Sequence, residues 1–360
     1  RLESTYERDI MKKSMLLVTV LMTVLGSPCL ADQQDVSLSK DGSILVTAKE
    51  RAIYVVDTKT MEVKKRIFSP AVVEAHCLDA KGAILAFRDD GNRFQLLELA
   101  TGKYIKTVDR IAKAVCFAPR AQLAAVVETK QWSEATSLVV LSISTGKEMA
   151  RVALPKGFVP ARMAFDPEAK QVTMISRGRK GDEKKVPYDK QPKIKDPRKK
   201  KEYEQKHDGR VSSLLTVDIV TKKAGKVRET WLTVDGRHGN IMFYRGGKIC
   251  FMQFEDLGAV LSEKDEITIV KGPISFNYGL GVRFADGAYA VGSMGDGAIV
   301  PAGKKPIKFE IVREQQLPGF PEYFYGFGFS STGVVYGITS AMRLVEISLK
   351  GKILRIKPIL

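Results

Sequence analysis

Cysteine and histidine, the residues that most often build disulfide frameworks and metal sites, are scarce in this sequence. Its 360 residues contain four cysteines and three histidines, too few for a disulfide scaffold or a protein with several metal ions. The motifs of serine hydrolases, zinc proteases, calcium loops and c-type haem attachment are also missing. We therefore assign no catalytic residue and no metal ligand, and the sequence identifies no cofactor.

Helical periodicity and long hydrophobic runs are nearly absent after residue 31. No stretch there reaches the roughly 18 apolar residues that a membrane-spanning helix needs, so we predict no membrane span. Hydrophobic residues still make up 44% of the chain, enough to bury a core. The scarcity of helical patterns points to a protein built from strands.

The N-terminal residues have the pattern of an export signal. Residues 1–10 contain no methionine and no apolar run, and we interpret them as extraneous upstream residues. Met11 is followed by Lys12 and Lys13, which form a short positive region. Residues 14–25 are then largely apolar, about the length of the hydrophobic part of a signal peptide and too short to cross a bilayer.

A cleavage site follows this apolar stretch. Cys29 and Ala31 place small residues at positions −3 and −1 of a cut before Asp32, as signal peptidases require. Residues 11–31 therefore predict a signal peptide of bacterial type and a periplasmic or secreted protein. Lipidation of Cys29 is the alternative, and Pro28 directly before the cysteine disfavours it.

The chain is basic, with 58 Lys and Arg against 41 Asp and Glu and a net charge of +17. In a cytosolic protein that balance would indicate a nucleic-acid partner. An exported protein meets other polyanions first, such as lipopolysaccharide, anionic phospholipid or acidic cell-wall polymer. We therefore expect a protein or an anionic envelope polymer as the partner rather than nucleic acid, and the oligomeric state stays open.

Residues 32–360 contain an internal repeat. Each unit opens with an apolar residue, usually four positions before a turn residue, and successive opening residues are 40, 39, 48, 78, 41 and 45 positions apart. The opening residues are Leu38, Leu78, Phe117, Phe165, Phe243, Phe284 and Phe329. Within a unit, β-branched residues alternate with period two, as in ILVTA and AIYVVD. Four short strands repeated seven times predict an all-β protein, a seven-bladed β-propeller.

A second column of residues supports this register. Residues that end an apolar run recur at Asp57, Glu98, Ser142, Asp218 and Glu346. A threonine follows each of the first four by three positions, at Thr60, Thr101, Thr145 and Thr221. Turns such as Thr-Gly-Lys begin at these threonines, so we expect a tight turn there in each unit.

The first repeat carries a family resemblance. The segment from Leu45 through Ile53-Tyr54-Val55-Val56-Asp57 to Ile67 resembles one repeat of the YVTN-type propellers, relatives of the WD-repeat proteins that are often exported in bacteria. The WD dipeptide itself is absent, and an acidic residue alone stands at its place. The resemblance implies a binding scaffold, an electron-transfer dehydrogenase subunit, or a lactonase- or lyase-like enzyme, so the fold does not select one function.

Residues 177–210 form a basic insertion in the fourth unit, between its strands QVTMIS and SSLLTVDIV. They contain 14 Lys and Arg against 7 Asp and Glu, three prolines and almost no large aliphatic residues, a composition that cannot pack as a core. In a propeller this loop shares a face with the connections between blades. It is either an arm for an acidic partner or polyanion, or a solvated loop. The densest positive charge lies at Arg198, Lys199, Lys200 and Lys201.

The same face collects other candidate binding residues. They are Phe158, His238, Phe276, Tyr278, Phe320 and Tyr323. Aromatic rings at a rim can stack on a sugar, a peptide or a cofactor. The alternative is that these rings seal the ends of the blades.

Two further columns concern the inner strands. Cys77 and Cys116 occupy the same position in adjacent units, and we expect buried thiols rather than a disulfide because neighbouring blades are too far apart. His76 falls where other units place a core apolar residue, which predicts a buried, hydrogen-bonded histidine. The residues of the inner column, which occupy the position equivalent to Cys77 in each unit, have mostly small side chains, with Met242 and Arg283 as exceptions.

These features favour an exported, non-enzymatic binding or protein-interaction scaffold that uses the loop-rich face. Enzymatic propellers usually gather polar or metal-binding residues around the channel mouth, and the inner column here is mostly small. The alternative is a propeller enzyme or enzyme subunit of the lactonase, lyase or dehydrogenase-subunit type.

Overall fold

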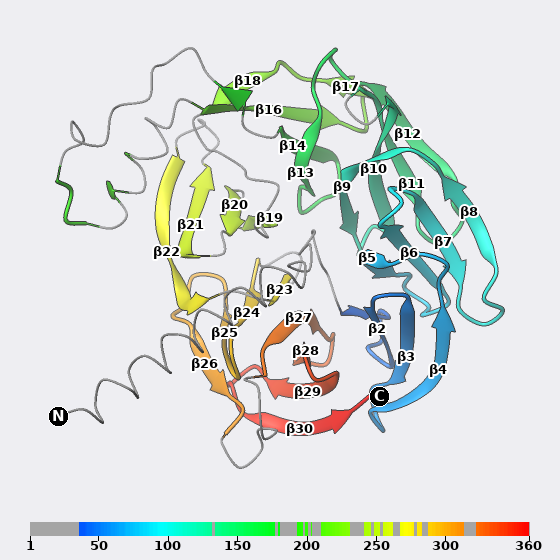
Figure 1. The fold of residues 1–360 in the computed structure, drawn as a ribbon, viewed down its shortest axis with the longest axis vertical. Helices are drawn as coiled ribbons and strands as arrows, with labels where there is room; N and C mark the ends of the chain where they lie inside the picture. Colours follow the sequence, from blue (N-terminus) through cyan, green and yellow to red (C-terminus); the bar gives the residue numbers. More distant parts are fainter. Residues whose placement is uncertain are drawn as a thin grey trace, which may run out of the picture. The chain divides into compact units, whose positions relative to one another are not determined.

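A computed structural model gives the fold of residues 31–360, one of the two units into which the chain divides; the other is residues 1–30. The structure describes residues 36–131, 134–176, 179–180, 193–196, 199–200, 203, 210–230, 241–245, 248–252, 255–261, 267–276, 279–282, 287–312 and 322–359. Nearly all the regular structure in these residues is β-strand (Figure 1). None of the helices among them is long and apolar enough to cross a membrane.

Three sheets in the first part of the chain each contain four antiparallel strands in sequence order. The first contains β1 (Ser37–Leu38), β2 (Ile44–Lys49), β3 (Ala52–Asp57) and β4 (Glu62–Phe68). The second contains β5 (Val73–Leu78), β6 (Ile84–Asp89), β7 (Phe94–Glu98) and β8 (Tyr104–Val108). The third contains β9 (Ile111–Ala118), β10 (Leu123–Gln131), β11 (Glu134–Ser142) and β12 (Glu148–Ala153).

The fourth sheet departs from this pattern. It contains β13 (Pro160–Phe165), β14 (Gln171–Ser176), β15 (Arg179–Lys180), β16 (Arg210–Asp218), β17 (Lys223–Ala224) and β18 (Arg228–Thr230). The long strand β16 pairs with β14 and β15 on one side and with β17 and β18 on the other. The second position of this sheet is therefore shared by β14 and β15, and the fourth position by β17 and β18.

The last two sheets complete the described strands. One contains β19 (Ile241–Arg245), β20 (Lys248–Met252), β21 (Glu255–Leu261) and β22 (Ile267–Phe276). The other has eight strands, β23 (Gly279–Val282), β24 (Tyr289–Gly292), β25 (Asp296–Val300), β26 (Ile307–Glu310), β27 (Phe324–Phe329), β28 (Val334–Thr339), β29 (Arg343–Ser348) and β30 (Ile353–Pro358). Its two antiparallel halves meet at one parallel pairing, Leu280 with Gly326.

Burial explains why the sequence shows apolar runs rather than simple alternation. The middle strands β2 and β3 contain runs of consecutive buried residues, so both of their faces are covered, whereas β4 at the sheet edge alternates between exposed and half-buried residues. A strand that packs on both faces needs apolar side chains at odd and even positions alike. Four-stranded antiparallel sheets covered on both faces make a propeller-like all-β fold.

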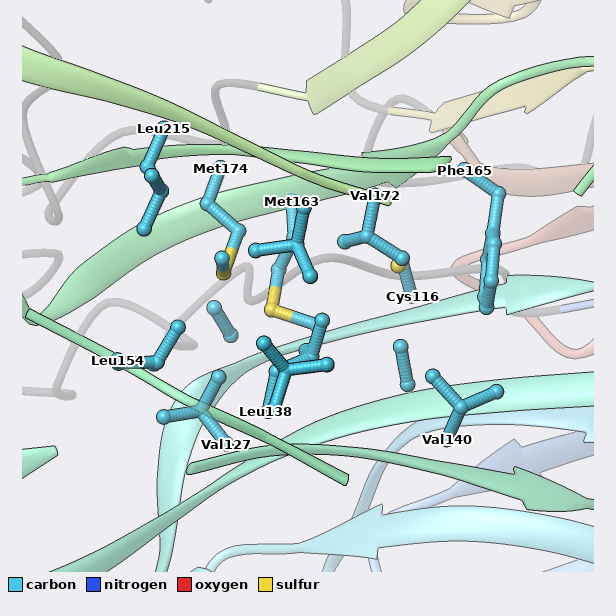
Figure 2. Close-up of a cluster of buried hydrophobic side chains, with 14 of the residues drawn as sticks. Cys116, Val127, Leu138, Val140, Leu154, Met163, Phe165, Val172, Met174 and Leu215 are labelled. Atoms are coloured by element: carbon cyan, nitrogen blue, oxygen red, sulfur yellow. The ribbon is translucent and has the colours of Figure 1, made fainter. Parts of the chain in front are cut away.

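Most core clusters join one sheet to its neighbour, and one cluster joins the two halves of the eight-stranded sheet. Figure 2 shows Val127 and Leu138 of the third sheet facing Met163 and Met174 of the fourth. Another cluster joins the first sheet to the last, with Leu45 packed in the same group as Leu344. Burying each such side chain contributes about 1.5–3 kcal/mol, so the interfaces between sheets hold the fold together.

The tight turns repeat with the sheets. The turn between the first and second strands of a repeat ends at a residue with a left-handed backbone, with φ between +55° and +81°. These residues are Gly42, Gly82, Ala169, Gly287 and Gly333. These are the turn residues expected from the repeat, and in the third sheet the left-handed residue is Gln122, one position later than expected. The second column of residues predicted from the repeat also stabilises a turn, since Asp57 accepts hydrogen bonds from the backbone amides of Lys59 and Thr60.

Candidate functional site

A cavity of about 620 Å³ opens at the ends of the innermost strands β1, β5, β9 and β27. We call it the inner-turn cavity. It is lined by Val36, Ser37, Leu38, Ser39, Lys40, Cys77, Leu78, Ala80, Pro119, Arg120, Gln122, Phe327, Gly328, Phe329, Ser330 and Ser331. These residues come from four sheets, and many lie in the turns that lead from the first strand of a sheet to the second.

Hydrogen bonds between neighbouring turns hold the rim of the cavity. The backbone amide of Lys40 donates to the carbonyl oxygen of Ala80 at 3.0 Å. The Ala80 amide in turn donates to Oε1 of Gln122 at 2.7 Å, and the Gln122 amide nitrogen donates to Pro119. The turns of three consecutive sheets are thereby tied together, so the rim is built in advance of any ligand.

The turn that follows β27 packs against the turn that follows β1, at Gly42. This glycine has φ +74°, and a Cβ atom added to it would lie 2.4 Å from Oγ of Ser330. Only glycine fits so close an approach with a left-handed backbone. The last and first sheets therefore meet at the cavity through a contact that a side chain would break.

The hydrogen-bonded histidine expected from the sequence contacts Ser37, a residue of the cavity lining. His76 is 1% exposed, and its Nδ1 lies 2.7 Å from Oγ of Ser37, which also contacts the His76 carbonyl oxygen at 3.1 Å. The prediction of a buried, hydrogen-bonded histidine is confirmed. The bond joins β1 to β5 directly beside the cavity.

The thiols expected to be buried are buried, and neither forms a disulfide with a described residue. Cys77 and Cys116 are 2% and 9% exposed. Burial raises the pKa of the Cys77 thiol to about 12, with a smaller contribution from Asp79. A thiol is nucleophilic only as the thiolate, so Cys77 is inert near neutral pH although it lines the cavity.

The accessible part of the lining combines half-buried apolar residues with polar groups, and two cations lie at the rim. Leu38, Pro119 and Phe329 are half-buried, and Lys40 and Arg120 are exposed. Among the described residues that line the cavity there is no aspartate or glutamate. The cavity therefore presents apolar surface beneath a positive rim.

Two carboxylates close to the rim are engaged within their own turns. Asp41 accepts hydrogen bonds from the hydroxyls of Ser39 and Ser43, and these bonds lower its pKa to about 2. Asp79 accepts from the backbone amides of Ala83 and Ile84 at 2.6 and 2.9 Å. Their oxygens stabilise the turns.

The opposite ends of the strands carry buried ion pairs. Glu322 is 6% exposed and accepts hydrogen bonds from Thr339 and from Nε of Arg343, the latter at 2.9 Å. Arg88, 1% exposed, pairs with Glu74. Because a buried charge without a partner is costly, these pairs lock the strand ends beneath the connections between sheets.

Of the residues predicted to bind on that face, three have described side chains at the surface. Lys199 and Lys200 are exposed, and Tyr323 is half-buried. The Tyr323 ring packs edge-on against Tyr325 with centroids 5.0 Å apart, and their hydroxyls lie 3.1 Å apart. The structure brings this tyrosine pair together, and neither residue lines the inner-turn cavity.

Other predicted residues lie in the core or outside the described part. Phe158 is 4% exposed and packs in the cluster between the third and fourth sheets, so its ring fills the core rather than the rim surface. Phe276 ends β22, but its side chain is outside the described residues. Also outside them are Arg198, Lys201, His238, Tyr278, Phe320 and Arg283. Their roles stay predictions.

Sequence reasoning did not find the inner-turn cavity. Its accessible residues stand beside the opening residues of the repeat, where Lys40 follows Leu38 and Arg120 follows Phe117 by a few positions. That position beside a turn was the available signal. No group of three or more His, Cys, Asp or Glu in the described residues is arranged to hold a metal ion.

Comparisons with known proteins add little beyond these observations. No protein-family model and no curated protein matches the chain. Among solved structures it is similar to a chain of hydrazine synthase from Kuenenia stuttgartiensis, at 12% identity with a TM-score of 0.42. The match covers 93% of this chain and 89% of that one. So distant a likeness says nothing about the ligand or reaction here, and the sheets themselves carry the fold.

Proposed function

We propose that the protein is a non-enzymatic binding scaffold built on a seven-bladed β-propeller of the YVTN or WD-repeat-like kind. Counting the halves of the eight-stranded sheet separately brings the sheets to seven. A core cluster that packs the first sheet on the last supports closure of the ring. The insertion predicted at residues 177–210 is then a basic loop in the fourth blade at residues 181–209, because Arg179, Lys180 and Arg210 at its ends belong to the paired strands β15 and β16.

The signal-like residues 11–31 support export to the periplasm or beyond. The mature chain then begins at Asp32. Mass spectrometry of the protein recovered from the periplasm or the medium measures this end directly. A soluble exported protein that retains Met11 contradicts the proposal.

The inner-turn cavity is the observation that carries the binding function. Its volume of about 620 Å³ lies within the range of about 300–1,000 Å³ typical of ligand pockets. Its rim is held by hydrogen bonds between turns, which lowers the entropy lost when a ligand binds. The Cys77 thiol beside it is protonated, which favours binding over thiol chemistry.

A block of the cavity tests this function. Ser331 is exposed and lines the cavity, whereas the neighbouring Thr332 is exposed and does not. The probe is N-phenyl-1-naphthylamine, a neutral dye that fluoresces in apolar sites. We expect Ser331→Trp to abolish dye binding and Thr332→Trp to leave it intact. Equal binding by both variants contradicts a ligand site here.

An enzyme of the lactonase- or lyase-like kind is the second candidate. The observation that favours it is the 2.7 Å contact between Oγ of Ser37 and Nδ1 of His76 beside the cavity, since an adjacent base can activate a serine. A fluorophosphonate probe distinguishes the two functions. Labelling that disappears in Ser37→Ala but persists in Ser331→Ala supports the enzyme, and absence of labelling supports the scaffold.

A further inference from the structure

We infer that the inner-turn cavity takes a small organic anion, with its apolar body on Leu38, Pro119 and Phe329 and its acidic group beside Lys40 and Arg120. This inference rests on the proposed function and adds the chemical class of the ligand. The three apolar residues are half-buried, and the two cations are exposed at the rim.

The cations at the rim are available for a ligand. Neither Lys40 nor Arg120 has a side-chain ion pair with a described residue. The nearby carboxylates of Asp41 and Asp79 accept hydrogen bonds within their own turns instead. The backbone bond from Lys40 to Ala80 at 3.0 Å fixes the base of the lysine at the rim.

Most hydroxyls of the lining are already used within the protein. Ser37 contacts His76, Ser39 donates to Asp41, and Ser330 lies 2.9 Å from Oγ1 of Thr332. Gln122 is used at both ends of its amide group. Ser331 is the exposed hydroxyl that lines the cavity. A ligand rich in hydroxyls would therefore find few partners, which favours an apolar body.

The size of the cavity separates a small molecule from a polymer. A volume of about 620 Å³ encloses one compact ligand, whereas a polyanion needs a charged groove that follows its backbone. The residues of the rim belong to turns tied together by hydrogen bonds, which suits a compact occupant. One anionic group beside two cations gives such a ligand its orientation.

Two matched dyes test the chemistry. 8-Anilinonaphthalene-1-sulfonate carries the aromatic body of N-phenyl-1-naphthylamine together with one negative charge. We expect the sulfonate dye to bind more tightly than the neutral dye to the full chain. Both should lose binding in Ser331→Trp, which localises them to the cavity. Sodium sulfate alone should compete weakly, because it lacks the apolar body.

Charge variants identify the partners of the acidic group. Lys40→Ala and Arg120→Ala should each weaken binding of the sulfonate dye by about twofold to fivefold, as expected for an exposed charge contact. The neutral dye should bind these variants as before. Lys81→Ala is the matched control, since Lys81 is exposed in the turn after Ala80 but does not line the cavity.

The outcomes separate this inference from the proposed function. Binding of both dyes with equal affinity, unaffected by Lys40→Ala and Arg120→Ala, overturns the anion preference but keeps the binding site. Absence of both dyes overturns the site and the inference together. Thermal melts of each variant show that it is folded, so loss of binding in a folded variant is decisive.

Discussion

Arg355 on the last strand donates a hydrogen bond of 3.0 Å to the carbonyl oxygen of Thr58, which stands 297 positions earlier in the chain. The same guanidinium donates to the Lys59 carbonyl oxygen at 2.7 Å. Lys65, on the outer strand of the first sheet, makes the equivalent contact with the second sheet by donating to the Leu99 carbonyl oxygen at 2.7 Å. Outer-strand cations thus cap the turn of the next sheet, and Arg355 does so between the last sheet and the first.

Arg355→Ala should loosen this junction. The variant loses two hydrogen bonds from a charged donor and the ion pair with Glu346. The side chain is 43% exposed, so solvent screening reduces the effect and we expect a loss of about 1 kcal/mol in the free energy of unfolding. Urea denaturation measures it, with Lys352→Ala as the exposed control. Equal stability of the two variants contradicts a role for the cap.

Gly42→Ala should destabilise more than Gly102→Ala. Both glycines have φ +74°, but a Cβ atom meets Ser330 at Gly42 and nothing within 4 Å at Gly102. The shared backbone strain costs about 1–2 kcal/mol, and crowding adds about 1–3 kcal/mol at Gly42 alone. Urea denaturation of the two variants isolates the contact between the first and last sheets. Equal losses would show that the turns do not press on each other.

The buried thiol predicts a dependence of stability on alkaline pH. The pKa of Cys77 is raised from 9.0 to about 12 by burial, so the folded state keeps the proton that the unfolded state loses. The contribution of this thiol to stability is complete below pH 9.0 and is lost progressively as the pH rises toward about 12. We expect the free energy of unfolding to fall less steeply above pH 9.0 in Cys77→Ala than in the unmodified protein. Parallel pH profiles contradict this.

Removal of the basic insertion tests its role. Lys180 and Arg210 are paired residues of β15 and β16, so residues 181–209 can be replaced by the two-residue turn Asn-Gly. We expect thermal stability to be retained, because a shorter loop costs less closure entropy. If the insertion binds polyanions, binding to lipopolysaccharide should weaken and its salt dependence should flatten.

The outcomes of this deletion are distinct. Unchanged stability with unchanged binding identifies a solvated loop. A large loss of stability shows that the insertion packs on the sheets, which contradicts the interpretation that its composition cannot pack as a core. Replacing Lys199 and Lys200 by glutamine in the full-length chain is the matched test of charge, since both side chains are exposed.

The sequence by itself determined the repeat and its turns, because these depend on local chemistry. The turn between the first and second strands of a repeat requires a residue with positive φ, and glycine at positions 42, 82 and 333 indicates this turn directly. The third turn shows the limit of this reasoning. Gln122 takes φ +57° there without glycine, and its side chain is held by hydrogen bonds to Pro119 and Ala80. No local pattern encodes that choice of residue.

The inner-turn cavity and the burial of Phe158 were decided by the tertiary structure alone. Leu38, Arg120 and Phe329 come together only because β1, β9 and β27 end at the same place. From its place in a connection, Phe158 was a candidate either for binding or for sealing a blade end, and the packing of the third sheet on the fourth buries it. Repeat spacing defines where strands begin and end along the chain. Which ends meet in space, and which rings are covered, follows from packing between sheets, a long-range property that no single repeat contains.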